Sequence, residues 1–151
     1  MLKELSKRQQ RLIKTVIQSK TARIKNSCFI VEGLKNVEEA LDSDFDIGFI
    51  VLSDAFLELH NVFLEKLKRK VSQDKLHKVS HKTFIELTDT VTPQGILAVV
   101  NFKDVEIDNI LKENFLIIAL DRIQDPGNMG TIIRTADAAG ADGIVVGKGC
   151  V

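Results

Sequence analysis

The segment from Asp125 to Gly140, DPGNMGTIIRTADAAG, holds the residues of this chain that are best suited to chemistry. Arg134 stands in a run of Ile, Thr and Ala, and arginine offers a planar, permanently charged fork that matches a phosphate group. Asn128 stands where a helix is expected to begin, so it can cap that helix and leave backbone N–H groups facing an anion. Two interpretations stay open: a site for an anionic ligand, or a plain helix cap with Arg134 paired to Asp121, Asp125 or Asp137.

A second charged feature is the N-terminal segment, residues 1–25. It holds eight Lys and Arg side chains against one acidic side chain, Glu4, although the formal net charge of the whole chain is zero. Such an uneven distribution indicates contact with a polyanion or, alternatively, a solvated helix face.

Other kinds of site find little support in the sequence. The three histidines and the two cysteines lack metal-ligand spacing, so no metal is expected. The stretch GIVVGKG lacks the spacing of a phosphate-binding P-loop. Because cysteines are few and neither a secretory signal nor a membrane span is visible, we expect a cytoplasmic protein without a membrane partner.

Hydrophobic periodicity predicts the elements that must position these residues. An amphipathic helix is expected from residue 2 to about 19. Seven further elements follow: strands at 28–33, 47–53, 75–80 and 95–102, and helices at 34–43, about 55–70 and 81–88. Ser53 or Asp54 is expected to cap the second of these helices. This alternation predicts an α/β domain over residues 22–102.

After a charged segment at 103–114, which we expect to be a linker, the pattern starts again. FLIIAL is expected to form a strand buried in a parallel sheet, followed by a helix from about Met129 to Ala139 and a strand in GIVVGKG. Gly140 stands where a left-handed helix C-cap belongs. Because one β-α-β unit of this length cannot bury a sheet by itself, we expect that Val151 is not the natural end of a complete domain.

The stretch ALDRIQDPGNMGTIIRTADAAGADGIVVGKGCV closely resembles the first motif of the SpoU (TrmH-type) RNA ribose 2′-O-methyltransferases, in the SPOUT superfamily. Upstream, FIVEGLKNVEEAL and TPQGILAVV resemble the substrate-binding domain of that family. The resemblance runs from about Arg8 to Val151. It implies an α/β protein with a ribosomal-protein-like RNA-binding domain, followed by the first β-α-β part of a trefoil-knot parallel-sheet domain. The implied parts are a basic helix at 1–21, the RNA-binding domain at 22–102, the linker at 103–114 and an incomplete methyltransferase domain at 115–151.

The resemblance also implies the activity: a homodimer that transfers a methyl group from S-adenosylmethionine to a ribose 2′-OH of RNA, rRNA more than tRNA. Arg134 matches the catalytic arginine of the family, and Asn128 lies beside it. A guanidinium is a poor base because its pKa is above about 12, so we expect Arg134 to orient the hydroxyl and to offset developing charge.

The two later motifs of the family do not occur in these residues, so no residue is assigned to the cofactor and the chain alone is expected to be inactive. The alternative is a non-catalytic RNA-binding module. In either case the expected RNA contacts are Lys7, Arg8, Arg11, Lys14, Arg23 and Lys25. Glu32 is expected to anchor a turn or to approach the RNA.

Overall fold

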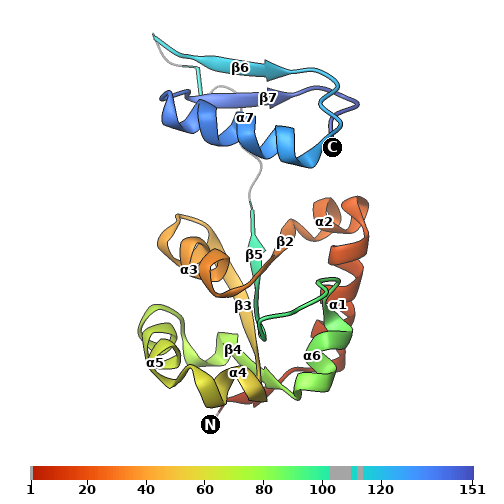
Figure 1. Ribbon diagram of the computed structural model, residues 1–151, viewed down its shortest axis with the longest axis vertical. Coiled ribbons are helices and arrows are strands. Elements are labelled where there is room, and N and C mark those ends of the chain that lie inside the picture. The colour runs from red at the N-terminus through yellow and green to blue at the C-terminus, as the bar shows by residue number, and fades with distance from the viewer. Residues whose placement is uncertain (1, 103–109, 112–113) are drawn as a thin grey trace. The chain divides into compact units, whose positions relative to one another are not determined.

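The computed structural model describes residues 2–102, 110–111 and 114–151 (Figure 1). The chain divides into two compact units at the boundary between residues 103 and 104. The linker predicted at 103–114 lies largely outside the described residues. None of the helices in the described ranges combines the length and the apolar character that crossing a bilayer requires.

A five-stranded mixed sheet forms the centre of the first unit. Its strands are β1 (Lys3–Glu4), β2 (Cys28–Glu32), β3 (Asp46–Ser53), β4 (Leu76–Val79) and β5 (Ile96–Asn101), in the spatial order β1-β4-β3-β5-β2. Strands β1, β4 and β3 are mutually parallel, whereas β5 runs antiparallel to both β3 and β2. Strand β2 therefore lies at one edge of the sheet.

Helices cover both faces of this sheet, with α3 and α5 on one side and α1 and α6 on the other (Figure 1). The helices of the first unit are α1 (Lys7–Gln18), α2 (Lys20–Asn26), α3 (Leu34–Asp42), α4 (Asp54–Leu59), α5 (Asn61–Lys70) and α6 (His81–Leu87), with a 3₁₀ turn at Gln73–Lys75. Successive side chains of a strand point to opposite faces. Leu52 accordingly packs with Val37 and Leu67, while Val51 packs with Val16 and other residues of the opposite face. The uninterrupted apolar runs in β3 and β5 follow from this double coverage.

The N-terminal prediction of one helix from residue 2 to about 19 is wrong in its first turn. Residues 3–4 form strand β1 beside β4, and the helix begins only after Ser6. The Ser6 hydroxyl accepts from the backbone N–H of Gln9, and the Gln9 side chain accepts from the backbone N–H of Ser6. This capping box defines the start of α1.

The single helix expected over about 55–70 is also wrong, because it is broken at His60. That residue has φ −124° and ψ 45°, outside the helical range, and it separates α4 from α5. The start agrees with the prediction, since the Ser53 hydroxyl accepts from the backbone N–H of Phe56 at 3.0 Å. The sequence analysis does not predict helix α2, whereas the other strands and helices of the first unit lie close to their predicted positions.

The second unit contains one β-α-β arrangement, as predicted. Strands β6 (Ile117–Leu120) and β7 (Gly143–Val146) are parallel, with Leu120 opposite Val146, and helix α7 (Pro126–Ala138) connects them. Gly140 follows the helix with φ 74°, in the left-handed region that its position requires. The α/β fold class is confirmed.

Candidate functional site

The loop between β6 and α7 begins at the carboxyl end of β6, where open α/β sheets bind their ligands. The N-cap of α7 is Asp125: its carboxylate accepts from the backbone N–H of Asn128 at 2.7 Å. The prediction that Asn128 caps this helix is therefore wrong. Asn128 lies within the first turn, and its side chain is exposed at the start of the helix. Pro126 occupies the first helical position, where its missing N–H has no cost.

Arg134 lies on the exposed surface of α7, and its guanidinium leans back toward the start of the helix. One terminal nitrogen, Nη2, donates to the Thr131 hydroxyl at 3.4 Å, and the Thr131 hydroxyl donates to the carbonyl of Gly127 at 2.9 Å. The other, Nη1, is 3.4 Å from the point that a Cβ on Gly130 would occupy. Long helical side chains commonly lean in this direction, toward the preceding turn.

No ion pair joins Arg134 to a carboxylate within the described residues of 110–151. The sequence left open an ion pair of Arg134 with Asp121, Asp125 or Asp137, and none of these three pairs forms among the described residues. The guanidinium therefore keeps hydrogen-bond donors for a ligand, and its fixed positive charge faces solvent.

The loop that carries this site is joined to the segment after β7. The backbone N–H of Gly147 donates to the carbonyl of Leu120 at 2.8 Å, and the backbone N–H of Val151 donates to the carbonyl of Ile123 at 2.9 Å. Arg122, between these two contacts, has φ 54°, which is uncommon for a residue with a Cβ. The carboxyl ends of β6 and β7 thus form one connected edge.

In the first unit, the basic residues of α1 share one face. Lys7, Arg8, Arg11 and Lys14 are exposed, and they project from the side of the helix opposite the buried Ile13 and Val16. None of these four residues, and neither Lys20 nor Lys25 of α2, forms an ion pair with a described residue. We call Lys7, Arg8, Arg11 and Lys14 the cationic face of α1.

Lysines elsewhere in the first unit behave differently. Six of them are neutralised by a neighbouring carboxylate: Lys35, Lys66, Lys68, Lys70, Lys75 and Lys78. A surface ion pair contributes little stability, but it does offset charge locally. Lys3, Arg69 and Lys82 also have no ion pair with a described residue, but the largest group of such cations in this unit lies on α1 and α2, where it can contact a polyanion.

Arg23 differs from the other predicted RNA contacts. Its Nη1 donates to the carbonyls of Val16 at 3.0 Å and Ile17 at 3.1 Å, so this half-buried side chain caps the C-terminal end of α1. A cation at that end also complements the helix dipole. The structure thus brings Arg23 together with the last turn of α1, whereas Lys25 remains exposed on α2.

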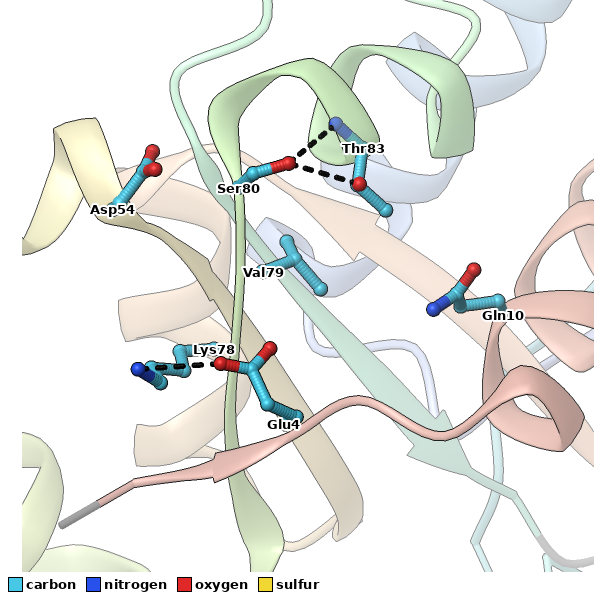
Figure 2. Close-up of a pocket in the computed structure, with 7 residues that line it drawn as sticks. All are labelled: Glu4, Gln10, Asp54, Lys78, Val79, Ser80 and Thr83. Atoms are coloured by element: carbon cyan, nitrogen blue, oxygen red, sulfur yellow. Dashed lines mark hydrogen bonds and ion pairs between the residues drawn. The ribbon is translucent and has the colours of Figure 1, made fainter.

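A polar pocket of about 310 Å³ beside β4 has its groups already engaged (Figure 2). Lys78 pairs with Glu4 at 3.2 Å, and the Ser80 hydroxyl accepts from the backbone N–H of Thr83 at 3.2 Å. Asp54 accepts from the backbone N–H of His81 at 2.7 Å. Because these contacts join two strands and hold the start of α6 against the start of α4, we assign the pocket a structural role.

Two family models together cover nearly all of the chain. The MRM3-like substrate binding domain matches residues 2–98, and the SpoU rRNA Methylase family matches residues 115–151. The chain belongs to the SpoU family. The resemblance carried by the DPGN loop and the Arg134 helix is thereby confirmed, and the SpoU motif coincides with the β6-α7-β7 arrangement.

Curated relatives of this SpoU chain are named as rRNA methyltransferases. The chain is 33% identical over 138 residues to the 23S rRNA (guanosine(2553)-2′-O)-methyltransferase RlmP of Bacillus subtilis, which covers 88% of this chain and 49% of RlmP. It is 32% identical over 148 residues to the mitochondrial rRNA methyltransferase 3A of Danio rerio, which covers 92% of this chain and 32% of that protein. The chain thus spans half or less of the length of these relatives.

Solved structures of the SpoU family have the same fold. The AdoMet-bound rRNA methyltransferase of Sinorhizobium meliloti superimposes with a TM-score of 0.76 at 31% identity, over 99% of this chain and 55% of that chain. The SpoU methyltransferase AviRb of Streptomyces viridochromogenes, in complex with AdoMet, gives a TM-score of 0.74 at 26% identity, over 94% and 53%.

The sequence reasoning missed the roles of two residues of helix α7, Asp125 at its start and Thr131 beside Arg134. Asp125 caps the helix, and the signal was present, because Asp is a preferred N-cap and Pro126 follows it at the first helical position. Thr131 contacts the guanidinium one turn before Arg134, at a spacing where helical side chains meet. The described residues contain no group of three or more His, Cys, Asp and Glu side chains that could hold a metal.

Proposed function

We propose that the complete protein containing this chain methylates a ribose 2′-OH of rRNA, and that this chain contributes the RNA-binding unit and the catalytic arginine. The observation that carries the proposal is the exposed Arg134 guanidinium, which has no carboxylate partner among the described residues and leans toward the ligand edge of the β-α-β unit. The names of the curated relatives support rRNA as the substrate.

In the proposed reaction, Arg134 acts on the 2′-oxygen of the target ribose. Negative charge develops on that oxygen as its proton passes to a phosphate oxygen of the RNA or to water, before the new bond to the methyl carbon is complete and the donor's bond to that carbon is broken. A guanidinium held within hydrogen-bond distance offsets this charge and aligns the hydroxyl, without itself giving up a proton at ordinary pH. Asn128, at the start of the same helix, supplies an exposed amide for a second contact with the ribose or its phosphate.

The methyl donor of the proposed reaction is S-adenosylmethionine, as in the AdoMet-bound relatives. The described residues of the second unit do not enclose such a group by themselves. Val145 and Val146 of β7 are 44% and 50% exposed, so the sheet that would have to shield a nucleoside is largely uncovered. We therefore assign no residue to the cofactor and derive no step through it.

The test of this proposal is methyl transfer by the complete protein to an rRNA fragment. Arg134→Ala is expected to lower the rate by at least about a hundredfold, the usual effect of removing one charge-stabilising donor. Binding of S-adenosylmethionine, measured by calorimetry, is expected to persist. Arg69→Ala removes an exposed arginine of the other unit and serves as the matched control. Loss of cofactor binding together with activity in Arg134→Ala would contradict the role.

A second candidate function is a non-catalytic RNA-binding module, supported by the match of residues 2–98 to a substrate binding domain and by the exposed cationic face of α1. The coding sequence beyond Val151 separates the two, because a continuation rich in further SpoU motifs supports the enzyme and an immediate stop supports the module. The family resemblance also supports a homodimer, and the small number of cysteines supports a reducing compartment such as the cytoplasm. Sedimentation and fractionation of the complete protein test these two points.

A further inference from the structure

A groove of about 460 Å³ opens along the outer edge of β2, within the roughly 300–1,000 Å³ typical of small-ligand sites. It is bounded by the last turn of α1, by α2, by β2 and by the segment that follows α6. The residues that matter for its chemistry are Ile17, Arg23, Phe29, Ile30, Glu32 and Asp89.

The floor of the groove is apolar and one wall is a fixed cation. Ile17 and Ile30 are half-buried on the same face of the sheet, so apolar surface remains accessible there. Phe29 borders the groove from the opposite face, where its ring packs against Phe45 and Phe102. The two carbonyls that hold Arg23 Nη1 also hold its guanidinium in place. An unpaired RNA base can stack on the plane of an arginine such as Arg23 and pack against the adjacent apolar side chains.

The backbone of β2 adds a donor and an acceptor to the same groove. Within the described sheet, β2 pairs with β5 alone. The N–H of Gly33 donates to the carbonyl of Ile96 at 3.0 Å, and the N–H of Phe102 donates to the carbonyl of Ser27 at 2.9 Å. Because residues of an antiparallel strand alternate between facing the partner and facing away, the N–H and C=O of Ile30 point outward.

Two carboxylates at the groove favour some chemical groups of an RNA over others. Glu32 accepts from the Thr90 hydroxyl, and the exposed Asp89 carboxylate has no hydrogen bond or ion pair with any described residue. These acids repel phosphate but accept hydrogen bonds from amino groups, as carboxylates do from the N4 amino group of cytosine. The cationic face of α1 ends within one turn of the groove, since Lys14 is three residues before Ile17.

We propose that this groove binds one unpaired RNA base that carries an exocyclic amino group, while the phosphates of the same strand lie along the cationic face of α1. The inference rests on the proposed RNA-binding function and adds a base preference to it. Cytosine, adenine and guanine fit this requirement. Uracil has no amino group and does not.

The test compares short oligocytidine and oligouridine of equal length, which carry the same charge, in binding to the complete 151-residue chain at neutral pH. Fluorescence anisotropy is expected to show about tenfold or more tighter binding of oligocytidine, the contribution of a hydrogen bond to a charged acceptor. The double variant Glu32→Met, Asp89→Ala is expected to abolish this ratio. The control Glu58→Met, Asp44→Ala removes the same charge from exposed sites outside the groove and is expected to retain it.

A second measurement does not depend on the stability of the variants. Photo-crosslinking of a 5-iodocytidine oligonucleotide to the unaltered chain is expected to modify the peptide that contains Phe29 and Ile30. Equal, salt-sensitive binding of both oligonucleotides with crosslinks confined to α1 overturns the groove and leaves the proposed RNA binding intact. Absence of any RNA binding overturns both. If the unaltered chain is a dimer and the Glu32→Met, Asp89→Ala variant is a monomer, a second protein chain occupies the groove, and this result also overturns the proposal.

Discussion

The Arg134 guanidinium lies over Gly130, with Nη1 3.4 Å from the point where a Cβ of residue 130 would stand. One helical turn separates the two residues, so the glycine leaves room for the arginine to lean toward the start of α7. A side chain longer than that of alanine at position 130 would meet the guanidinium, and glycine inside a helix costs about 1 kcal/mol relative to alanine.

Substitution of Gly130 is expected to separate stability from activity. Gly130→Ala should raise the free energy of unfolding by up to about 1 kcal/mol, because alanine favours the helix and 3.4 Å is an ordinary contact distance. Gly130→Leu should displace the guanidinium and lower methyl transfer in the complete protein by about tenfold or more. Chemical denaturation and transfer assays on both variants provide the two measurements. Full activity in Gly130→Leu would show that the position of the guanidinium over residue 130 is unimportant.

The cationic face of α1 is expected to determine the salt dependence of RNA binding. The variant Lys7→Ala, Arg11→Ala, Lys14→Ala should lower the slope of log K against log salt by about 2, since each phosphate contact contributes roughly 0.7 on single strands. The matched control is Lys66→Ala, Lys68→Ala, Lys70→Ala, which removes the same charge from lysines already paired with carboxylates. Titrations at several salt concentrations measure both slopes, and equal slopes would reject a specific role for α1.

Arg23 and Lys25 are expected to differ in what their removal changes. Arg23→Ala should lower the free energy of unfolding by about 1 kcal/mol, because the partly exposed guanidinium holds two carbonyls at the end of α1. Lys25→Ala should change it by less than about 0.5 kcal/mol, as expected for an exposed side chain without a partner among the described residues. Urea denaturation compares the two. A larger loss in Lys25→Ala would contradict the capping role of Arg23.

His77 is expected to make the stability of the first unit depend on pH. Burial lowers the pKa of this imidazole below its usual value, and the positive charge of Lys3 on β1 lowers it further, against the opposing effects of the Glu4 backbone and the Asp74 charge. The unfolded chain, with a histidine pKa of about 6.5, then binds more protons than the folded chain between the two pKa values. The contribution is therefore fully present above about pH 6.5 and is lost as pH falls through the folded pKa.

The variant His77→Gln should flatten this dependence. Urea midpoints measured between about pH 5 and pH 7.5 are expected to fall on acidification in the parent chain and to fall less in the variant. The Gln9 amide, 2.9 Å from His77 Nε2, retains a polar neighbour in the variant, so the fold itself should persist. Identical slopes in the two proteins would assign the acid sensitivity to other groups.

Several features followed from the sequence alone. Continuous apolar runs located the strands, because a strand buried on both faces has no polar positions. Helical periodicity located most helices, because a helix with one solvent-facing side alternates apolar and polar residues every three to four positions. The DPGN loop and Arg134 identified the family, since residue types at that spacing reflect local backbone geometry rather than long-range contacts. The six RNA contacts proposed from the basic segment remain predictions, with Arg23 now shown to cap α1.

Other features depended on the tertiary structure. Residues 3–4 have no intrinsic strand signal, and they form a strand because the edge of β4 offers hydrogen-bond partners. Asp125 and Asn128 are both good caps, and only the folded loop shows that Asp125 accepts the N–H bond. Distances between side chains decide whether Arg134 pairs with a nearby carboxylate. They also decide which cations of the first unit have no acidic partner. Those distances are set by packing, which residue order does not encode locally.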